Sequence, residues 1–295
     1  MRLGSSPAAA VGTPRAAASL LEDFSLEMTG KDVAGLEEAA AGIPRGTRIH
    51  VTFLGSEDLA TRVAAARAVR RLGFVPVPHL SARRLPSRGA FEEYLGALRA
   101  EGACEDVLLV GGDPAVPEGP YPDALSLVGS GLLPRYGVRH AAVTGYPEGH
   151  PAIPDHVLWS ALTAKSDALA AQGLAGGVVT QFGFDAEAVL GWIEEARDRG
   201  VALPVRVGVP GPAGVRRLLA YAARFGVGTS TSIARKYGLS ITHLMGTAGP
   251  DRFLRALAAG LRPERHGEVK VHFYTFGGLG ATAEWVAGFR TEAGA

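Results

Sequence analysis

The segment VTGYPEGHP, residues 143–151, places three chemically capable side chains on one short loop. Tyr146, Glu148 and His150 supply a phenol, a carboxylate and an imidazole, and two prolines stiffen the loop. The loop follows the apolar residues HAAV, which are typical of a buried strand. Ligands of parallel α/β proteins commonly bind beyond the carboxyl ends of such strands. The loop is therefore a candidate binding segment.

Glu27 is a second candidate, because it interrupts the apolar segment FSLEM at residues 24–28. A carboxylate inside a buried strand is costly unless it is paired or protonated, and neither Leu26 nor Met28 can pair with it. Burial raises the pKa of a carboxyl group, and a general acid at neutral pH needs a raised pKa. We therefore expect Glu27 to act as a general acid, with a buried Glu–Arg ion pair as the structural alternative.

Polar residues also stand within or just after the other apolar segments. They are Thr52, His79, Asp113, Gln181 and Tyr274. Gly111 and Gly112, directly before the aspartate, allow a flat ligand or a phosphate to approach the backbone. If the segments are parallel strands of one sheet, these side chains meet at its carboxyl edge.

The apolar segments alternate with amphipathic ones along the chain. The predicted strands are 24–28, 48–53, 74–80, 106–113, 140–146, 176–184, 204–210 and 270–276. Helical spacing is clear in 57–71 and 186–199, which are followed by the cap residues Gly73 and Gly200. The pattern predicts an α/β fold, a single (β/α)8 TIM barrel with extra helices between strands 7 and 8, within 211–269. An open doubly wound sheet is the alternative, but its glycine-rich fingerprint is missing after the first strand.

Composition limits the partners and the compartment. The chain has 295 residues, of which 47% are hydrophobic, and we expect a flexible tail at 1–19, or a transit peptide, before a barrel at 20–295. The net charge of +1 gives no footprint for nucleic acid. No apolar run approaches the roughly 18–20 residues of a membrane span. A single cysteine, Cys104, indicates a reducing, cytoplasmic setting.

Two further kinds of site are disfavoured by spacing. His79, His150 and Asp113 could meet in space, but no pair has helical ligand spacing, so a catalytic metal is not expected. Cys104 falls in a predicted loop between helix and strand, and no serine lies in a G-x-S-x-G elbow. Nucleophilic catalysis is therefore not expected either.

Taken together, these segments resemble the methylenetetrahydrofolate reductase family over about residues 24 to 290. The most specific motifs are YPEGHP (146–151), TQFGFD (180–185) and HFYTF (272–276). PHL (78–80), GGDP (111–114) and the glutamate of the first strand support them. The order and spacing of the motifs also agree with the family.

The resemblance implies a 5,10-methylenetetrahydrofolate reductase, or the reverse oxidation, in one-carbon metabolism. NADH or NADPH would reduce FAD, which passes hydride to a folate protonated at N10. The implied catalytic residues are Glu27 and Asp113, and the implied flavin contacts are Thr52, His79, Gly112, Asp113, Tyr146, His150 and Lys165. The implied folate contacts are Glu27, Asp113, Gln181 and Tyr274. A homo-oligomer is also implied, with no membrane or nucleic-acid partner.

The chain departs from the family near the flavin. MTGKD stands where a phenylalanine–proline run is usual, and Gly111 stands where an arginine often precedes the Gly-Asp pair. Leu158, Ala161 and Ala164 replace polar flavin contacts near Lys165. Lost phosphate contacts weaken FAD binding. Two alternatives therefore stay open: a flavin-independent reductase with direct hydride transfer from NADH, and a non-redox folate-binding or methyl-transferring barrel.

Overall fold

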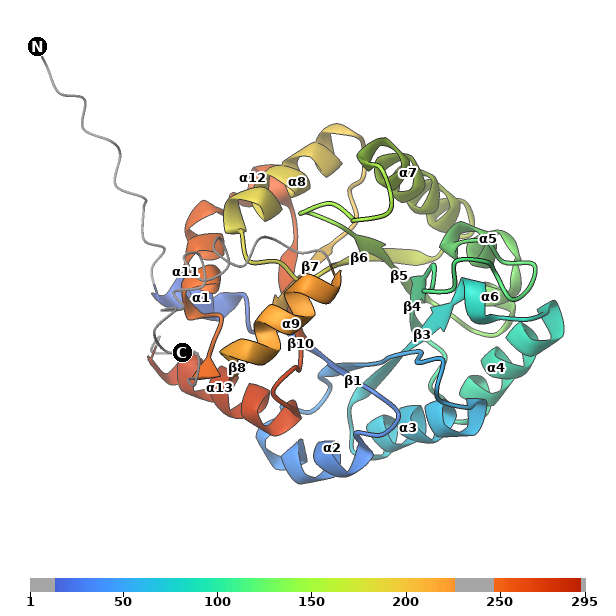
Figure 1. The fold of residues 1–295 in the computed structure, drawn as a ribbon, viewed down its shortest axis with the longest axis horizontal. Coiled ribbons are helices and arrows are strands. Elements are labelled where there is room, and N and C mark those ends of the chain that lie inside the picture. Colours follow the sequence, from blue (N-terminus) through green and yellow to red (C-terminus); the bar gives the residue numbers. More distant parts are fainter. Residues whose placement is uncertain (1–13, 226–246, 293–295) are drawn as a thin grey trace, which may run out of the picture.

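A computed structural model describes residues 14–225 and 247–292, and its centre is a closed parallel barrel (Figure 1). The strands are β1 Ser25–Met28, β2 Arg48–Val51, β3 Val75–Ser81, β4 Asp106–Val110, β5 His140–Gly145, β6 Ala175–Thr180, β7 Val205–Pro210 and β10 Val269–Tyr274. Strand β1 pairs in parallel with both β2 and β10, which closes the ring. The predicted α/β barrel is confirmed, and all eight strands fall within a few residues of the predicted segments.

Helices surround the strands and fill most of the connections (Figure 1). They are α2 Val33–Ala39, α3 Leu59–Arg71, α4 Arg88–Ala100, α5 Ala124–Gly129, α6 Leu132–Arg135, α7 Asp155–Ala171, α8 Ala186–Asp198 and α13 Leu279–Glu292. The side chain of Asp58 caps α3 by accepting the Thr61 N–H at 2.7 Å, and Gly73 follows the helix with a φ of 86°. This left-handed conformation suits glycine and ends the helix.

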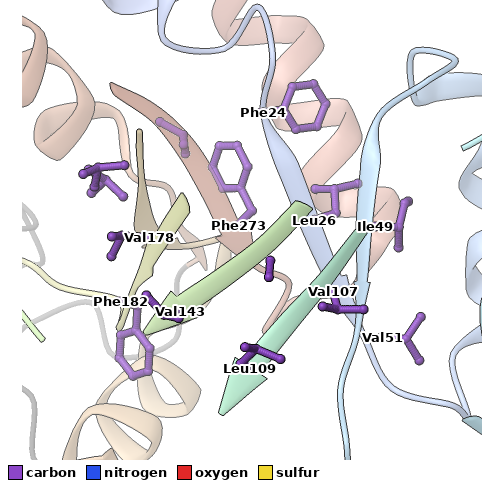
Figure 2. Packing of buried hydrophobic residues seen from close by; sticks show 14 of the residues in the cluster. Phe24, Leu26, Ile49, Val51, Val107, Leu109, Val143, Val178, Phe182 and Phe273 are labelled. Carbon is purple, nitrogen blue, oxygen red and sulfur yellow. The ribbon is translucent and has the colours of Figure 1, made fainter. Parts of the chain in front are cut away.

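The alternation of side chains along the strands separates two apolar layers. Val107 and Leu109 of β4 belong to the large cluster between strands and helices, whereas Leu108 belongs to a small cluster with Val77 and Val179 inside the barrel. Figure 2 shows part of the large cluster, including Val107 and Leu109. Because neighbouring strand residues face opposite sides, the same rule identifies which polar residues point inward.

The connection from β7 to β10 holds the extra helices that were predicted. They are α9 Val215–Phe225, α11 Asp251–Gly260 and α12 Pro263–His266, with a small sheet of β8 Ala213–Gly214 and β9 Thr247–Ala248. In Figure 1, α9 lies over the middle of the ring. The ring of Tyr221 on α9 stacks on Phe276, just beyond β10, at 4.0 Å between centroids. Helix α9 therefore lies at the carboxyl end of the strands, here called the mouth.

The amino-terminal boundary differs from the expectation. Residues Pro14–Ser19, part of the predicted tail, form helix α1, which packs against α11 and α13. Ala17 and Ala18 are buried there, because small side chains let the helix approach its neighbours closely. The remainder of the predicted tail lies outside the described residues.

Candidate functional site

Glu27 lies inside the barrel, among imidazoles rather than guanidinium groups. It pairs in register with His50 of β2. Its Oε2 atom lies 3.6 Å from Nε2 of His272 and 3.9 Å from Nε2 of His79, and its side chain is 19% exposed. Among the described residues, no lysine or arginine lies within ion-pair distance of it. The alternative of a buried Glu–Arg pair is therefore not what the structure shows.

The barrel's arginines are engaged at the opposite end. Arg48 and Arg206, which point inward at the amino-terminal ends of β2 and β7, both pair with Asp23. The Arg48 contact measures 3.1 Å and the Arg206 contact 2.5 Å. A network of opposite charges thus closes the floor, and the nearest side-chain partners of the acid near the mouth are imidazoles.

The three histidines around Glu27 form one connected group. His79 Nε2 lies 3.4 Å from His50 Nδ1, and the rings of His50 and His272 are 4.4 Å apart. Burial lowers the pKa of His79 to about 4, although the Glu27 carboxylate opposes that shift. Burial, with His272 and His79 nearby, also holds the pKa of His50 well below its usual value. His79 and His50 are therefore neutral at physiological pH.

Tyr274 and Gln181 complete the polar side of the mouth. The Tyr274 hydroxyl donates to the carbonyl of Thr180 on β6 at 3.1 Å. Burial, with the negative charge of Glu27, raises the pKa of Tyr274 well above its ordinary value. The Gln181 side-chain oxygen accepts the N–H of Phe182 at 3.1 Å, and the Phe182 ring packs edge-on against Tyr274. Tyr274 and Gln181, both predicted folate contacts, thus lie at the carboxyl ends of β10 and β6.

The structure places Asp113 differently. Its two carboxylate oxygens accept from Nε and Nη2 of Arg84, each at 2.7 Å, and its side chain is 76% exposed. The hydrogen bonds from Arg84 hold the pKa of Asp113 below its usual value, with a smaller effect from Arg224 of α9. Gly112, with a φ of 98°, makes the turn before it. Asp113 is thus part of a rim ion pair, apart from the group around Glu27.

Thr52 follows β2, and its hydroxyl oxygen is buried without a hydrogen-bond partner. Its backbone N–H donates to the Met28 carbonyl at 2.9 Å, which extends the pairing of β1 and β2 toward the mouth. An unpartnered buried hydroxyl is unfavourable. Thr52 therefore has unused hydrogen-bonding capacity beside Glu27's strand.

Glu148 anchors the loop that follows β5 to the neighbouring loop. Glu148 Oε1 accepts the N–H groups of Phe184 and Asp185, at 2.7 and 3.2 Å, from the loop after β6. Tyr146 and His150 face each other edge-on at 5.2 Å. The glutamate of the loop thus has a structural task, while the phenol and the imidazole border an open space.

That space is a cavity of about 1160 Å³ between the β5 loop and helices α5, α7 and α8. Tyr146, His150 and Lys165 line it, as do the stacked rings of Trp159 and Trp192. Lys165, on α7, is 8% exposed, and burial lowers the pKa of its ammonium group to about 8, against the opposing charge of Asp123. We call this space the side cavity; neither Glu27 nor Gln181 lines it.

The arrangement provides acid–base chemistry beside flat, aromatic surfaces. Several of its members were not predicted from the sequence, namely Ser25, His50, His272, Trp159 and Trp192. Strand alternation could have found two of them, because His50 precedes Thr52 by two residues and His272 precedes Tyr274 by two. The tryptophans lie on α7 and α8 and required the packing of two helices.

Two other properties concern the part of the chain that the structure describes. No cluster of three or more His, Cys, Asp or Glu residues there could hold a metal ion. No helix there combines the length and the apolar character needed to cross a bilayer.

Comparison with known proteins returns solved structures that include dihydropteroate synthases. Dihydropteroate synthase from Thermus thermophilus, in complex with 6HMPPP, is 18% identical with a TM-score of 0.47, covering 92% of this chain and 94% of that one. The Burkholderia cenocepacia enzyme is 16% identical with a TM-score of 0.48, covering 92% of both chains. No protein-family model matches the chain. At this level the likeness concerns the barrel fold alone.

The predicted family and activity are corrected on this ground. The two structures named above are dihydropteroate synthases, and no family model supports a methylenetetrahydrofolate reductase. The predicted reductase family and its oxidoreductase activity are therefore wrong, whereas binding of FAD and of NADH or NADPH stays a prediction. Asp113 forms a rim ion pair with Arg84, and its role beside a bound ring system stays a prediction. The alternative of a non-redox barrel remains.

Proposed function

We propose that this chain binds a pterin-type heterocycle at the barrel mouth and acts on it without redox chemistry, with Glu27 as the proton donor. The observation that carries the proposal is the Glu27 carboxyl group between two imidazoles, 3.6 and 3.9 Å away, with no lysine or arginine of residues 14–225 and 247–292 within ion-pair distance. A carboxyl group in such surroundings is able to exchange a proton with a ring nitrogen.

The neighbouring groups suit a flat heterocycle. Gln181 offers an amide, which both donates and accepts, as the edge of a pterin does. Phe182 and Tyr274 offer aromatic surfaces beside it. Protonating a ring nitrogen that carries a one-carbon group makes this nitrogen a better leaving group. Tetrahydrofolate derivatives are therefore the proposed substrates, and transfer of a methyl group is the proposed reaction class.

The side cavity supports a second binding function. Its aromatic lining and the buried ammonium group of Lys165 suit a planar ligand that carries negative charge. We assign Tyr146, His150 and Lys165 to this ligand, which is either the acceptor or the anionic tail of a folate. We also place the protein in the reducing cytoplasm, a location that agrees with Cys104, the single cysteine, which is buried. A homo-oligomer stays a prediction, to be measured by light scattering.

The test is anaerobic calorimetry with a panel of ligands. Tetrahydrofolate, 5-methyltetrahydrofolate, 6-hydroxymethylpterin and 6HMPPP are compared with guanosine, which shares the pterin's hydrogen-bonding edge. We expect at least one pterin to bind with a Kd in the micromolar range and guanosine to bind at least about tenfold more weakly. Absence of binding by every pterin contradicts the proposal.

Variants locate the binding. Gln181→Leu should weaken pterin binding about 10-fold, because a ligand polar group loses its partner. Gln172→Leu is the matched control, since Gln172 donates to Val128 at the far end of α7. Lys165→Met should weaken only ligands with an anionic tail, whereas Lys270→Met, near the floor, should not. Equal losses in Gln181→Leu and Gln172→Leu would refute the assignment of the mouth.

A further inference from the structure

His272 is a polar side chain enclosed near the mouth. It is fully buried, and its Nδ1 atom lies 2.9 Å from the Ser25 hydroxyl. Its Nε2 atom is buried without a hydrogen-bond partner. That unpartnered atom lies 3.6 Å from Oε2 of Glu27. A buried polar atom without a hydrogen-bond partner costs free energy. The position of Nε2 opposite Glu27 therefore needs a functional explanation.

The Ser25 hydroxyl contacts Nδ1 of His272, the ring nitrogen opposite the one that lies near Glu27. When the hydroxyl donates to Nδ1, the single proton of the neutral imidazole stays on Nε2 and faces Glu27. Ser25 and His272 are also register partners on β1 and β10, so the backbone pairing holds both side chains at one level. In addition, the Thr275 hydroxyl donates to the Glu27 carbonyl at 2.6 Å and fixes the main chain beneath the acid.

The other groups near Glu27 are less suited to this task. From β3, His79 Nε2 is farther, at 3.9 Å, and is shared with His50 of β2. From β10, the Tyr274 hydroxyl donates to the Thr180 carbonyl. No other basic side chain of the described residues lies within ion-pair distance of the Glu27 carboxyl group. His272 is thus the best-placed donor for it.

We propose that His272, oriented by Ser25, is a positioning residue that stabilises the Glu27 carboxylate left behind by proton transfer. The inference rests on the proposed function of Glu27. In the step, the Glu27 O–H bond breaks and an N–H bond forms on the bound ring. The Nε2–H of His272 then donates to the new carboxylate and keeps its own proton. Hydrogen bonds to a charged acceptor are stronger than those to a neutral one, so the contact favours the ionised product.

The experiment measures how much of the bound ligand is protonated. Tetrahydrofolate and 6-hydroxymethylpterin change their absorbance spectra when a ring nitrogen gains a proton, and the spectrum of the bound ligand is recorded against pH. In His272→Leu, we expect the ratio of protonated to neutral ligand to fall about 10- to 100-fold. The affinity should change by less than about threefold, since His272 does not touch the ligand.

The second variants separate positioning from packing. His272→Gln places an amide donor near the position of Nε2 and should restore most of the protonated fraction. Ser25→Ala, which removes one oxygen, should lower it about three- to tenfold, because the ring tautomer is no longer selected. His266→Asn is the matched control: His266 is also buried, and its Nδ1 accepts the Arg262 N–H at 2.9 Å far from the mouth. It should leave the spectrum unchanged.

The outcomes distinguish the two proposals. If no pterin binds, or if Glu27→Gln leaves the protonated fraction intact, the proposed function fails. If Glu27→Gln abolishes ligand protonation while His272→Leu leaves it unchanged, only the role of His272 is overturned. Equal effects of His272→Leu and His272→Gln, with both proteins folded by circular dichroism, likewise overturn it.

Discussion

The two sides of the barrel interior have opposite characters. The wall formed by β10, β1, β2 and β3 carries Ser25, Glu27, His50, His79 and His272. The wall formed mainly by β4, β5 and β6 carries Leu108, Ala142 and Val179, with Val77 of β3 at the boundary. Both walls belong to one closed ring of strands with the same pleat. The fold therefore does not require polar groups in its interior.

The apolar wall contributes mainly to stability, whereas the polar wall carries the groups proposed for the chemistry. Dispersion and burial hold the apolar wall together, and these forces depend on filled volume. The polar wall contains groups that are neutral or weakly paired, which contribute little to stability in relation to their cost of burial. The polar wall is costly to bury and poor in ion pairs. We therefore attribute it to the proposed interaction with a ligand.

Replacing the acid should produce the largest change in chemistry. Glu27→Gln keeps the shape of the polar wall but removes its proton, so ligand protonation or turnover should fall about 10²- to 10⁴-fold. The free energy of unfolding should change by less than about 1 kcal/mol, since no ion pair with a cation is lost. Single-turnover absorbance and urea denaturation measure the two effects. A comparable loss of both would show that the polar wall is structural.

Replacing an apolar counterpart should have the reverse effect. Leu108, which is 3% exposed, leaves a cavity when changed to alanine, and Leu108→Ala should lower the free energy of unfolding by about 2–5 kcal/mol. The spectrum of a bound pterin should stay the same. Val157→Ala, at a position that is 43% exposed, is the control and should cost less than about 0.5 kcal/mol. Loss of ligand protonation in Leu108→Ala would remove the distinction between the walls.

Acid should destabilise the polar wall. Burial lowers the pKa of His79 from 6.5 to about 4 in the folded protein, so between these pH values the unfolded chain binds more protons. The stabilisation is therefore present above pH 6.5 and is lost as the pH falls toward 4, by about 3 kcal/mol for this group. Urea denaturation across this range measures it. His79→Gln should flatten the profile, and an unaltered slope would contradict the neutral state of His79.

The rim ion pair should have the smallest effect. Asp113→Asn breaks an exposed contact with Arg84, and exposed pairs contribute about 0–1 kcal/mol. Ligand protonation should change by less than about threefold, because the structure separates Asp113 from Glu27's histidines. The same spectra test this expectation. A loss as large as that of Glu27→Gln would extend the reactive region from the polar wall to the rim.

The strands and the barrel were accessible from the sequence because their signal is local. Continuous apolar segments such as DVLLV mark strands that are buried on both faces, and glycine endings mark helix ends. Glu27 was also accessible, since a charge within an apolar segment is conspicuous. His272 was read as part of a motif and not as a partner of the acid, because its role depends on β1 closing against β10.

Other features depend on contacts that no local pattern records. Asp113 follows a buried strand, as a ligand-binding residue does, but its carboxylate meets Arg84 from the loop after β3. The alanines and serine of Pro14–Ser19 read as a tail, and they form a helix because α11 and α13 offer a surface. The family expectation failed in a similar way, since short motifs that suit a binding loop do not determine the reaction at the neighbouring acid.

The two hydrogen bonds that the Phe184 and Asp185 N–H groups donate to Glu148 have a consequence for redesign. They join the loops after β5 and β6 into a single unit, although 36 residues separate Glu148 from Phe184. Grafting one loop from another barrel would break the two hydrogen bonds between the Glu148 carboxylate and the backbone of Phe184 and Asp185. Anyone altering the specificity of this protein should exchange both loops together, as one cassette.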